Sequence, residues 1–392
     1  KVMLEVFPPL DEAKNLYRDP GVRHRWGEFL SKVFARYANK VEIFEIGSTP
    51  NRGRWSGFSF LDYQSAWAIA IDKAEGLEVQ LAGPNVSDFE PFYNASILAS
   101  MARFGRSPDI HTDNLFVERV IEPEAYDHRV FGRFATHWLK LNLLKKARIL
   151  ALIGAENGSA ELMCTYKCWT SKRLARRSPW PDQKRVDYLV RYLALAAGSG
   201  ALRRVYWGPL ICARDGLISD QIEAYPVIDQ VSYYQKVRGE LSDFTINSGF
   251  SALAHAVERF SGTQVSCLIH QPYGMSIFQF DAETANTFLL CWCRDRMSVP
   301  IMDVFKHEGL ASAAFFNACG EPISQPVIID EQPLFIEFDH DNNSPNLTTL
   351  DAEASRGVIH LSSPSHRSIS DTEGDWLGAG ILRADHQRQD LE

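Results

Sequence analysis

One carboxylate stands out because an apolar run precedes it. Glu156 follows ILALIGA (149–155), and leaving an ionised carboxylate idle beside such a run would cost free energy. We therefore take Glu156 as a candidate for chemistry, with Glu161 in the following loop as its substitute. The alternative is that Glu156 is an exposed residue of the glycine-containing segment GAENGSA (154–160).

Other polar or aromatic residues also follow apolar runs, at the points where strands would end. They are Ser48, Thr49 and Asn51, then Asn85, then His111 and Asp113, and finally Trp207. Hydroxyls, amides, an imidazole and an indole are groups that bind small polar ligands in a concave site. This distribution predicts a site built from the ends of several strands.

The elements that would position these residues alternate along the first 215 residues. Six short apolar runs are expected as strands: 2–7, 41–46, 78–83, 109–114, 148–155 and 203–210. Between them lie helical patterns, such as Tyr63, Ala66, Trp67 and Ala70 on one stripe. Pro181 opens another helix, which ends at Gly198. Alternating strands and helices predict a parallel sheet with helices outside it.

Two folds fit this alternation, an open doubly wound sheet and a closed (β/α)8 barrel of the TIM type. The first strand is not followed by Gly-x-Gly-x-x-Gly, and the sequence contains no Gly-x-x-x-x-Gly-Lys. We therefore expect no nucleotide cofactor. The polar residues at the strand ends favour the barrel, because a barrel collects its chemistry at that edge.

Past about residue 240 the pattern changes to short strands separated by turns, which predicts a C-terminal antiparallel β-sandwich. We expect a barrel domain over 1–238, the sandwich over 239–340, and a polar tail or linker over 341–392. The tail is a candidate for contact with a further domain or protein.

The composition of the chain limits the classes of binding partner that we expect. The chain has 392 residues, 45% of them hydrophobic, with a formal charge of −8, which argues against nucleic acid or an anionic membrane as main partner. No run of apolar residues is long enough for a transmembrane helix. The seven cysteines have no zinc-site spacing, so we expect no metal and read them as reduced thiols. That favours a reducing compartment, while the first residue, Lys1, leaves the cytoplasm and the periplasm both open.

These pieces together resemble the retaining (β/α)8-barrel glycoside hydrolases, particularly family 39 and its bacterial exopolysaccharide relatives. The similarity runs from about residue 1 to 339 and is carried by FEIGSTPNRGRW (44–55), VQLAGPNV (79–86), DIHTDN (109–114), LIGAENG (152–158) and RVYWGPL (204–210). In this register the six strands correspond to strands three to eight of the family. Two more strands would precede residue 1, or the barrel would close differently.

The resemblance implies a retaining mechanism, in which two carboxyls about 5–5.5 Å apart flank the anomeric carbon. It places the nucleophile at Glu156. The family's Asn-Glu-Pro-Asn reads Ser48-Thr49-Pro50-Asn51 here, so Thr49 occupies the position of the acid/base Glu. By the same resemblance, Ser48, Asn51, His111 and Trp207 are candidate sugar-binding residues, with Trp207 stacking on a sugar face.

A replacement acid would have to come from elsewhere. In a continuous strand, Glu45 and Thr49 would point to the same side, because they are four residues apart. Glu45 would then lie about 13 Å from Thr49 along the strand, toward the barrel interior. We therefore expect Glu45 to be a buried, hydrogen-bonded or ion-paired residue. The loop after the 109–114 strand offers Glu118 and Glu122, with Glu124 and Asp127 nearby. Burial there would raise a carboxyl pKa toward that of a general acid.

The segment 158–182, expected as an insertion behind Glu156, carries Arg173 and Arg176 beside Lys172 and Arg177. It is either a solvated basic face or a site for an acidic glycan, since guanidinium groups bind carboxylates in pairs of hydrogen bonds. Two functions follow. The chain either hydrolyses a bacterial surface polysaccharide or oligosaccharide with an altered acid site, or binds such a glycan without cleaving it, as a receptor or assembly subunit in polysaccharide biosynthesis.

Overall fold

The computed structural model describes residues 2–115, 121–126, 128, 130–212, 216–220, 240–270, 274–282, 287–294, 296–305, 310–338 and 358–360. Contacts divide the chain into two units. The first comprises Lys1–Cys168 and Ser199–Pro209, and the second comprises Trp169–Gly198 and Leu210–Glu392. The domain limits expected at residues 238 and 340 stay predictions, and nearly all of the expected tail lies outside the described residues.

The first unit is built on a six-stranded parallel sheet. Its strands are β1 (Met3–Val6), β2 (Ile43–Ile46), β3 (Gln80–Val86), β4 (Ile110–Asp113), β5 (Glu161–Lys167) and β6 (Leu202–Trp207). They lie in chain order, and every neighbouring pair is parallel. This curled sheet fits part of a TIM-type barrel, so the expected α/β class is confirmed at that level.

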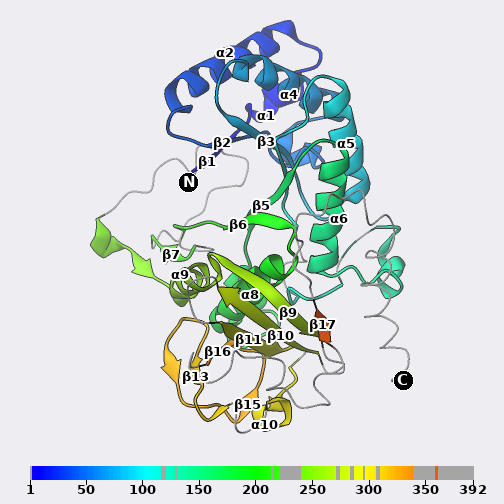
Figure 1. Ribbon diagram of the computed structural model, residues 1–392. Coiled ribbons are helices and arrows are strands. Elements are labelled where there is room, and N and C mark those ends of the chain that lie inside the picture. Colours follow the sequence, from blue (N-terminus) through cyan, green and yellow to red (C-terminus); the bar gives the residue numbers. More distant parts are fainter. Residues whose placement is uncertain are drawn as a thin grey trace. The chain divides into compact units, whose positions relative to one another are not determined.

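Helices connect these strands (Figure 1). The longer ones are α2 (Pro20–Tyr37), α4 (Phe60–Ala74), α5 (Pro91–Arg103) and α6 (Leu143–Glu156). The shorter ones are α1 (Leu10–Ala13), α3 (Gly53–Ser56) and the 3-10 turn η1 (Arg133–His137). Parallel strands need a crossover of about a dozen residues or more, and helices supply it here.

The predicted helical stripes form the core between the helices and the sheet. Tyr63, Ala66, Trp67 and Ala70 are all buried. The indole of Trp26 on α2 donates a hydrogen bond to the carbonyl of Ala66 (3.2 Å), and the hydroxyl of Tyr63 donates to the carbonyl of Ile46 at the end of β2 (2.9 Å). Apolar burial and these satisfied polar groups hold α2 and α4 against the sheet.

The prediction of a strand at 148–155 is wrong. This run belongs to helix α6, whose buried side includes Leu143, Ala147, Leu150 and Gly154, a spacing of three and four residues that fits a helix. The side chain of Asn142 caps the helix by accepting from the backbone N–H of Lys145 (3.0 Å). The fifth strand lies instead at Glu161–Lys167, inside the segment expected as an insertion.

The second unit contains helices and a seven-stranded sheet whose pairings are all antiparallel, in the order β14, β13, β16, β11, β10, β9, β17. These strands span, in chain order, β9 (Thr263–His270), β10 (Met275–Ala282), β11 (Phe288–Cys293), β13 (Ala314–Phe316), β14 (Pro322–Ile323), β16 (Leu334–Glu337) and β17 (Val358–His360). Two small sheets pair β12 (Val299–Pro300) with β15 (Ile328–Ile329), and β7 (Ile218–Ser219) with β8 (Thr245–Ile246). The helices are α7 (Ser171–Leu174), α8 (Pro181–Gly198), α9 (Ser248–Phe260), α10 (Ile301–Val304) and the 3-10 turn η3 (Leu241–Asp243).

Helices cover one face of the antiparallel sheet. A Cβ on Gly198 of α8 would lie 2.4 Å from the Phe278 ring of β10, and Phe260 of α9 stacks on Phe280 at 4.7 Å. The opposite face packs on α10 and the β12–β15 pair. The antiparallel strands were expected, but the described residues form a helix-covered sheet rather than the two large facing sheets of a β-sandwich. Helix α8 begins and ends where the sequence predicts.

We expect Asn142→Ala to lower the free energy of unfolding by about 1 kcal/mol, because the capped N–H of Lys145 loses its acceptor. Urea denaturation followed by circular dichroism measures this change. Asn142→Asp, which keeps a capping oxygen, is the matched control and is expected to stay close to the parent protein. Equal stability of all three proteins would contradict the capped helix.

Candidate functional site

The inner face of the parallel sheet changes from apolar to polar along its strands. The lower layer is apolar and consists of Met3, Ile43, Ala82, Ile110 and Met163. Side chains two positions further along a strand lie on the same face. Here these are Glu5, Glu45, Pro84, Thr112 and Thr165, and all but Pro84 are polar, so they begin a polar layer beneath the carboxyl ends of the strands.

Two glutamates of this layer lie close to each other on neighbouring strands. Glu5 of β1 and Glu45 of β2 are partners in the parallel register. Burial and the nearby Glu5 carboxylate raise the pKa of Glu45 well above its ordinary value, while hydrogen bonds from Thr112, Thr165 and Asn85 oppose that rise. Glu45 is therefore a buried, hydrogen-bonded residue, as expected, although its charged neighbour is another acid.

Glu5 differs from Glu45 because its side chain reaches solvent. Protein nevertheless surrounds it on most sides, and this desolvation raises the pKa of its carboxyl, opposed by hydrogen bonds from Ser48 and Asn85. The contact with Ser48 shows that this candidate sugar-binding hydroxyl is held beside a carboxyl of β1.

Asn85 connects the strands of the polar layer. Its amide Nδ2 donates to Glu5 Oε1 (3.0 Å), and its backbone N–H donates to Thr112 Oγ1 (2.9 Å). Its Oδ1 accepts from Asn114 Nδ2 (2.7 Å), and Asn114 Oδ1 in turn accepts from the Thr165 hydroxyl (3.3 Å). Asn85 adopts a left-handed backbone with φ 54°, a strained conformation that clusters at functional sites.

The loop after β2 bends sharply at Thr49. Gly47 and Thr49 have φ of 79° and 43°, and the backbone N–H of Thr49 donates to the carbonyl of Asn85 (3.0 Å). Strand β2 ends at Ile46, so the chain between Glu45 and Thr49 is not extended. The parity argument that placed the two on one side of a continuous strand is therefore wrong.

The side chain of Asn51 is hydrogen-bonded to the neighbouring loop. Its Nδ2 donates to the carbonyl of Ser87 (2.7 Å), and its Oδ1 accepts from the N–H of Ser87 (2.9 Å). Beside it, Arg52 pairs with Asp88 (2.6 Å) and Glu90 (2.7 Å). Because both polar ends of the Asn51 side chain bind backbone, Asn51 fixes the β2 loop to the β3 loop. These hydrogen bonds do not serve sugar binding, the role predicted for Asn51.

His111 lies on the helix side of the sheet. Its Nε2 is 2.7 Å from Asn94 Oδ1 on α5, and its Nδ1 is 3.1 Å from the carbonyl of Leu150 on α6. The ring is fully buried, and burial lowers its pKa to about 4. Since its neighbours on both nitrogens belong to the outer helices, the structure does not bring His111 to the inner face with the other candidates.

Glu156 lies at the opposite edge of the sheet from these strand ends. It is the last residue of α6 and is exposed. The turn that follows it contacts the residues that lead into β4, with the hydroxyl of Ser159 donating to the carbonyl of Pro108 (2.7 Å). Both segments precede their strands, so they lie at the amino ends of β4 and β5. The expectation that Glu156 follows a strand is wrong, because the apolar run before it is helical.

Lys167 is the residue that the sequence analysis missed. It is the last residue of β5, is fully buried, and is the register partner of Trp207 at the end of β6. Burial lowers the pKa of Lys167 to about 7, with Lys146 lowering it further and Cys164, Cys168 and Asp88 opposing. The predicted strand at 148–155 hid Lys167. Had the strand been predicted at 161–167, Lys167 would have stood out as its last residue, just before the long segment 168–181.

The remaining candidates lie at different places in the fold. Trp207 is half-buried at the end of β6, as predicted. Glu118 lies outside the described residues, and Glu122 is half-buried in the loop after β4. Arg173 on α7 and Arg176 just after it belong to the second unit. Their proposed contact with an acidic glycan stays a prediction.

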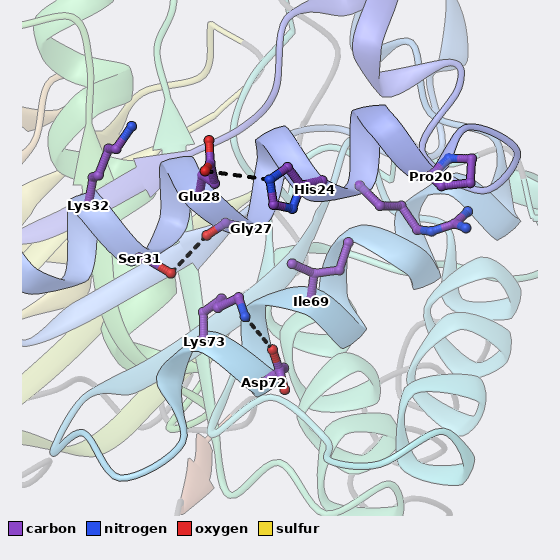
Figure 2. A pocket seen from close by; sticks show the side chains of 10 residues that line it. Pro20, His24, Gly27, Glu28, Ser31, Lys32, Ile69, Asp72 and Lys73 are labelled. Carbon is purple, nitrogen blue, oxygen red and sulfur yellow. Dashed lines mark hydrogen bonds and ion pairs between the residues drawn. The ribbon is translucent and has the colours of Figure 1, made fainter.

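A surface hollow lies elsewhere, between α2 and α4 (Figure 2). It is lined largely by charged side chains, including His24, which is 3.5 Å from Glu28, and Lys73, which is 2.7 Å from Asp72. These helices pack outside the sheet, so the hollow is separate from the strand ends. Within the described residues, no group of three His, Cys, Asp or Glu side chains is placed to hold a metal. Nor is any described helix both long and apolar enough to cross a membrane.

The structure of this chain resembles those of several known proteins. A family 39 glycoside hydrolase from the gut symbiont Bacteroides cellulosilyticus WH2 superposes with a TM-score of 0.59 at 14% identity, over 85% of this chain and 63% of that one. This chain has a glycoside hydrolase-like fold. At that identity the likeness concerns the fold alone, and the chain spans less than two thirds of that protein.

Two further glycoside hydrolases are more distant. A GH51 arabinofuranosidase from Xanthomonas axonopodis pv. citri has 9% identity and a TM-score of 0.44, covering 83% of this chain and 74% of its own. The catalytic domain of GH30 xylanase C from Talaromyces cellulolyticus has 10% identity and a TM-score of 0.44, with coverages of 81% and 67%. At these scores neither carries an argument. No protein-family model matches the sequence, and a comparison with curated proteins finds no match.

The paired glutamates predict a specific dependence of stability on pH. The folded pKa of Glu5 and that of Glu45 lie above the ordinary value, so the folded protein holds protons that the unfolded chain releases in that window. The free energy of unfolding therefore falls as pH rises through the window. Glu45→Gln removes one charge and is expected to be more stable than the parent at pH 8, with the difference shrinking toward pH 5.

Urea unfolding between pH 5 and pH 8 measures this difference. Glu75→Gln, at an exposed carboxyl beyond α4, is the control and should leave the pH slope unchanged. A Glu45→Gln protein that is less stable at every pH would show that the carboxyl is needed in its ionised form.

Proposed function

We propose that this chain is a glycoside hydrolase-like barrel that binds a carbohydrate at the carboxyl ends of its parallel strands and does not cleave it by the two-carboxylate retaining mechanism. One observation carries the proposal. In the register of the family resemblance, β2 and β5 are the strands that carry the acid and the nucleophile. They are followed here by segments 47–61 and 168–181, which contain no Asp or Glu.

The residues that stand at those strand ends have the wrong chemistry for cleavage. A retaining glycosidase needs one carboxylate to attack and one carboxyl to protonate the leaving oxygen, about 5–5.5 Å apart. Thr49 has an alcohol that cannot act as a general acid near neutral pH. Lys167 presents a cation or a neutral amine at the end of β5, where an anionic nucleophile would be required.

The same edge retains groups suited to binding. Ser48 and Glu5 supply a hydroxyl and a carboxyl side by side near the ends of β2 and β1, and Glu5 reaches solvent. Trp207 is half-buried at the end of β6, and an indole offers an apolar face and a polar edge to a pyranose ring. Sugars are recognised by this combination of planar hydrogen-bonding groups and an aromatic platform.

The hydrolase interpretation, with Glu156 as nucleophile and Glu118 or Glu122 as surrogate acid on a bacterial surface polysaccharide, finds less support. Glu156 lies at the amino edge of the sheet. A shift of several ångströms in a catalytic group already abolishes most of the rate, and here the group stands at the other end of the strands.

An aryl glycoside with a very good leaving group tests cleavage, because 2,4-dinitrophenolate needs no acid assistance. We expect dinitrophenyl β-glycosides of the common hexoses and pentoses to give no burst of phenolate with the parent protein or with Thr49→Glu. A stoichiometric burst that disappears in Glu156→Gln would overturn the proposal and restore Glu156 as nucleophile.

Binding is tested on an array of bacterial and plant glycans. We expect the parent to retain a subset of them, and Trp207→Ala to weaken that binding about tenfold through loss of the stacking platform. Trp180→Ala, at an exposed Trp of the second unit, is the matched control and should bind as the parent does. Undiminished binding by Trp207→Ala would remove the indole from the site.

A further inference from the structure

Two carboxyl groups lie side by side on the first two strands of the parallel sheet. Glu5 of β1 and Glu45 of β2 are register partners, so their backbones are about 4.8 Å apart. The side chain of Asn85 contacts both carboxyls, which places them on the same, inner face of the sheet. Like charges this close repel each other, so a proton or a cation that offsets part of the charge stabilises the pair.

Neither carboxyl has a basic partner. Within the part of the chain that the structure describes, no ion pair includes Glu5 or Glu45. The basic residues Arg203 and Arg204 of β6 are engaged at the other edge of the sheet, where they pair with Glu42, the residue that precedes β2, at 3.9 and 3.5 Å. The two carboxyls of the polar layer are therefore left without a cation.

One atom of the pair also lacks a hydrogen bond. Oε1 of Glu45 is buried and has no hydrogen-bond partner among the described residues, although hydrogen bonds from Thr112, Thr165 and Asn85 reach this carboxyl. A buried polar atom in that state costs free energy. A positive charge at the neighbouring Glu5 would offset part of this cost, because it stabilises the ionised form of the pair.

Glu5 is the member of the pair that a ligand can reach. Its side chain is exposed, whereas Glu45 is 1% exposed. Oε1 of Glu5 accepts from Asn85 Nδ2 (3.0 Å), and the Ser48 side chain also hydrogen-bonds to this carboxyl. These neighbours hold the Glu5 carboxyl near the carboxyl ends of β1 and β2, the edge at which we place the carbohydrate.

An ammonium group fits this carboxyl better than a metal ion does. Calcium and magnesium ions take about six or more oxygen ligands, and the described residues offer no group of three His, Cys, Asp or Glu side chains placed to hold a metal. Asn85 also presents its N–H to Glu5, where a metal would require an oxygen. An ammonium group needs only acceptors, and its hydrogen bond to a carboxylate is short and strong.

We propose that Glu5 binds the amino group of an amino sugar in the glycan, and that Glu45 is a positioning residue that acts on this amino group through Glu5. The inference rests on the proposed function, since it names the class of sugar bound at that same edge. It differs from the earlier prediction of an acidic glycan at Arg173 and Arg176, which belong to the second unit.

The proposal fixes the sign of the pH dependence. Burial raises the pKa of Glu5 and that of Glu45, and the charge of Glu5 raises the pKa of Glu45 further. The other titratable group beside the pair is Tyr63 of α4, which faces Glu45. An ammonium group binds the ionised carboxylate, so at low pH it must displace protons. Affinity for an amino sugar therefore rises as pH increases through the raised pKa of the pair, while the amine keeps its own proton.

Matched oligosaccharides test the proposal by isothermal titration calorimetry at pH 5 and pH 6.5, where the amines stay largely ionised. The probes are tetramers of glucosamine and of galactosamine, each paired with its N-acetylated form, which is neutral. We expect at least one amino tetramer to bind about tenfold or more tightly than its acetylated form at pH 6.5. The preference is expected to be smaller at pH 5.

Variants assign the preference to the carboxyl pair. Glu5→Gln is expected to abolish the preference while keeping the affinity for the acetylated tetramer. Glu78→Gln, which removes an exposed charge just before β3, should change neither and controls for the general attraction of an acidic protein for cations. Glu45→Gln relieves the repulsion on Glu5 and is expected to move the midpoint of the pH profile to lower pH, a shift that a purely structural role of Glu45 would not produce.

The outcomes separate the two proposals. Equal affinity for the amino and acetylated tetramers, or a preference that survives in Glu5→Gln, overturns the amino-sugar site and leaves glycan binding intact. A pH profile unmoved in Glu45→Gln contradicts the role of Glu45. Failure of every tetramer to bind, together with an empty glycan array, overturns the proposed function and this inference with it.

Discussion

The hydrogen bonds of Asn85 are the interaction on which the candidate site depends. Its side chain reaches Glu5 on β1 and Asn114 after β4, and its backbone binds Thr112 on β4 and Thr49 in the β2 loop. Each of these groups would be costly to bury without a partner. One residue therefore satisfies the polar layer across four strands, and its left-handed backbone is the strain that this geometry requires.

Most of the parallel sheet could be predicted from the sequence because its strands are short β-branched or apolar runs between amphipathic helices. Helix α8 was predicted to the residue, since Pro181 and Gly198 mark its ends chemically. The failure at 148–155 has a physical cause. A continuous apolar run fits a buried strand and a buried helix equally, and only the longer spacing from Leu143 to Gly154 distinguishes them.

The candidate site was less predictable for the same reason. A misplaced strand moved Glu156 to the wrong edge of the sheet and concealed Lys167 within a supposed insertion. Asn51 and His111 were singled out as sugar-binding candidates, but their hydrogen-bond partners, Ser87 and Asn94, are 36 and 17 residues away in the chain. Whether a polar side chain faces a ligand or satisfies the backbone depends on such distant partners, which the local sequence does not reveal.

The polar layer also bears on how such a scaffold changes its chemistry. The hydrogen bonds centred on Asn85 lie within and just beyond the strands, whereas the side chains of Thr49 and Lys167 stand at the strand ends. The cohesion of the sheet and the identity of its terminal residues are thus separable properties. A substitution at a strand end can therefore change what that edge of the sheet binds while the layer below keeps the strands in register.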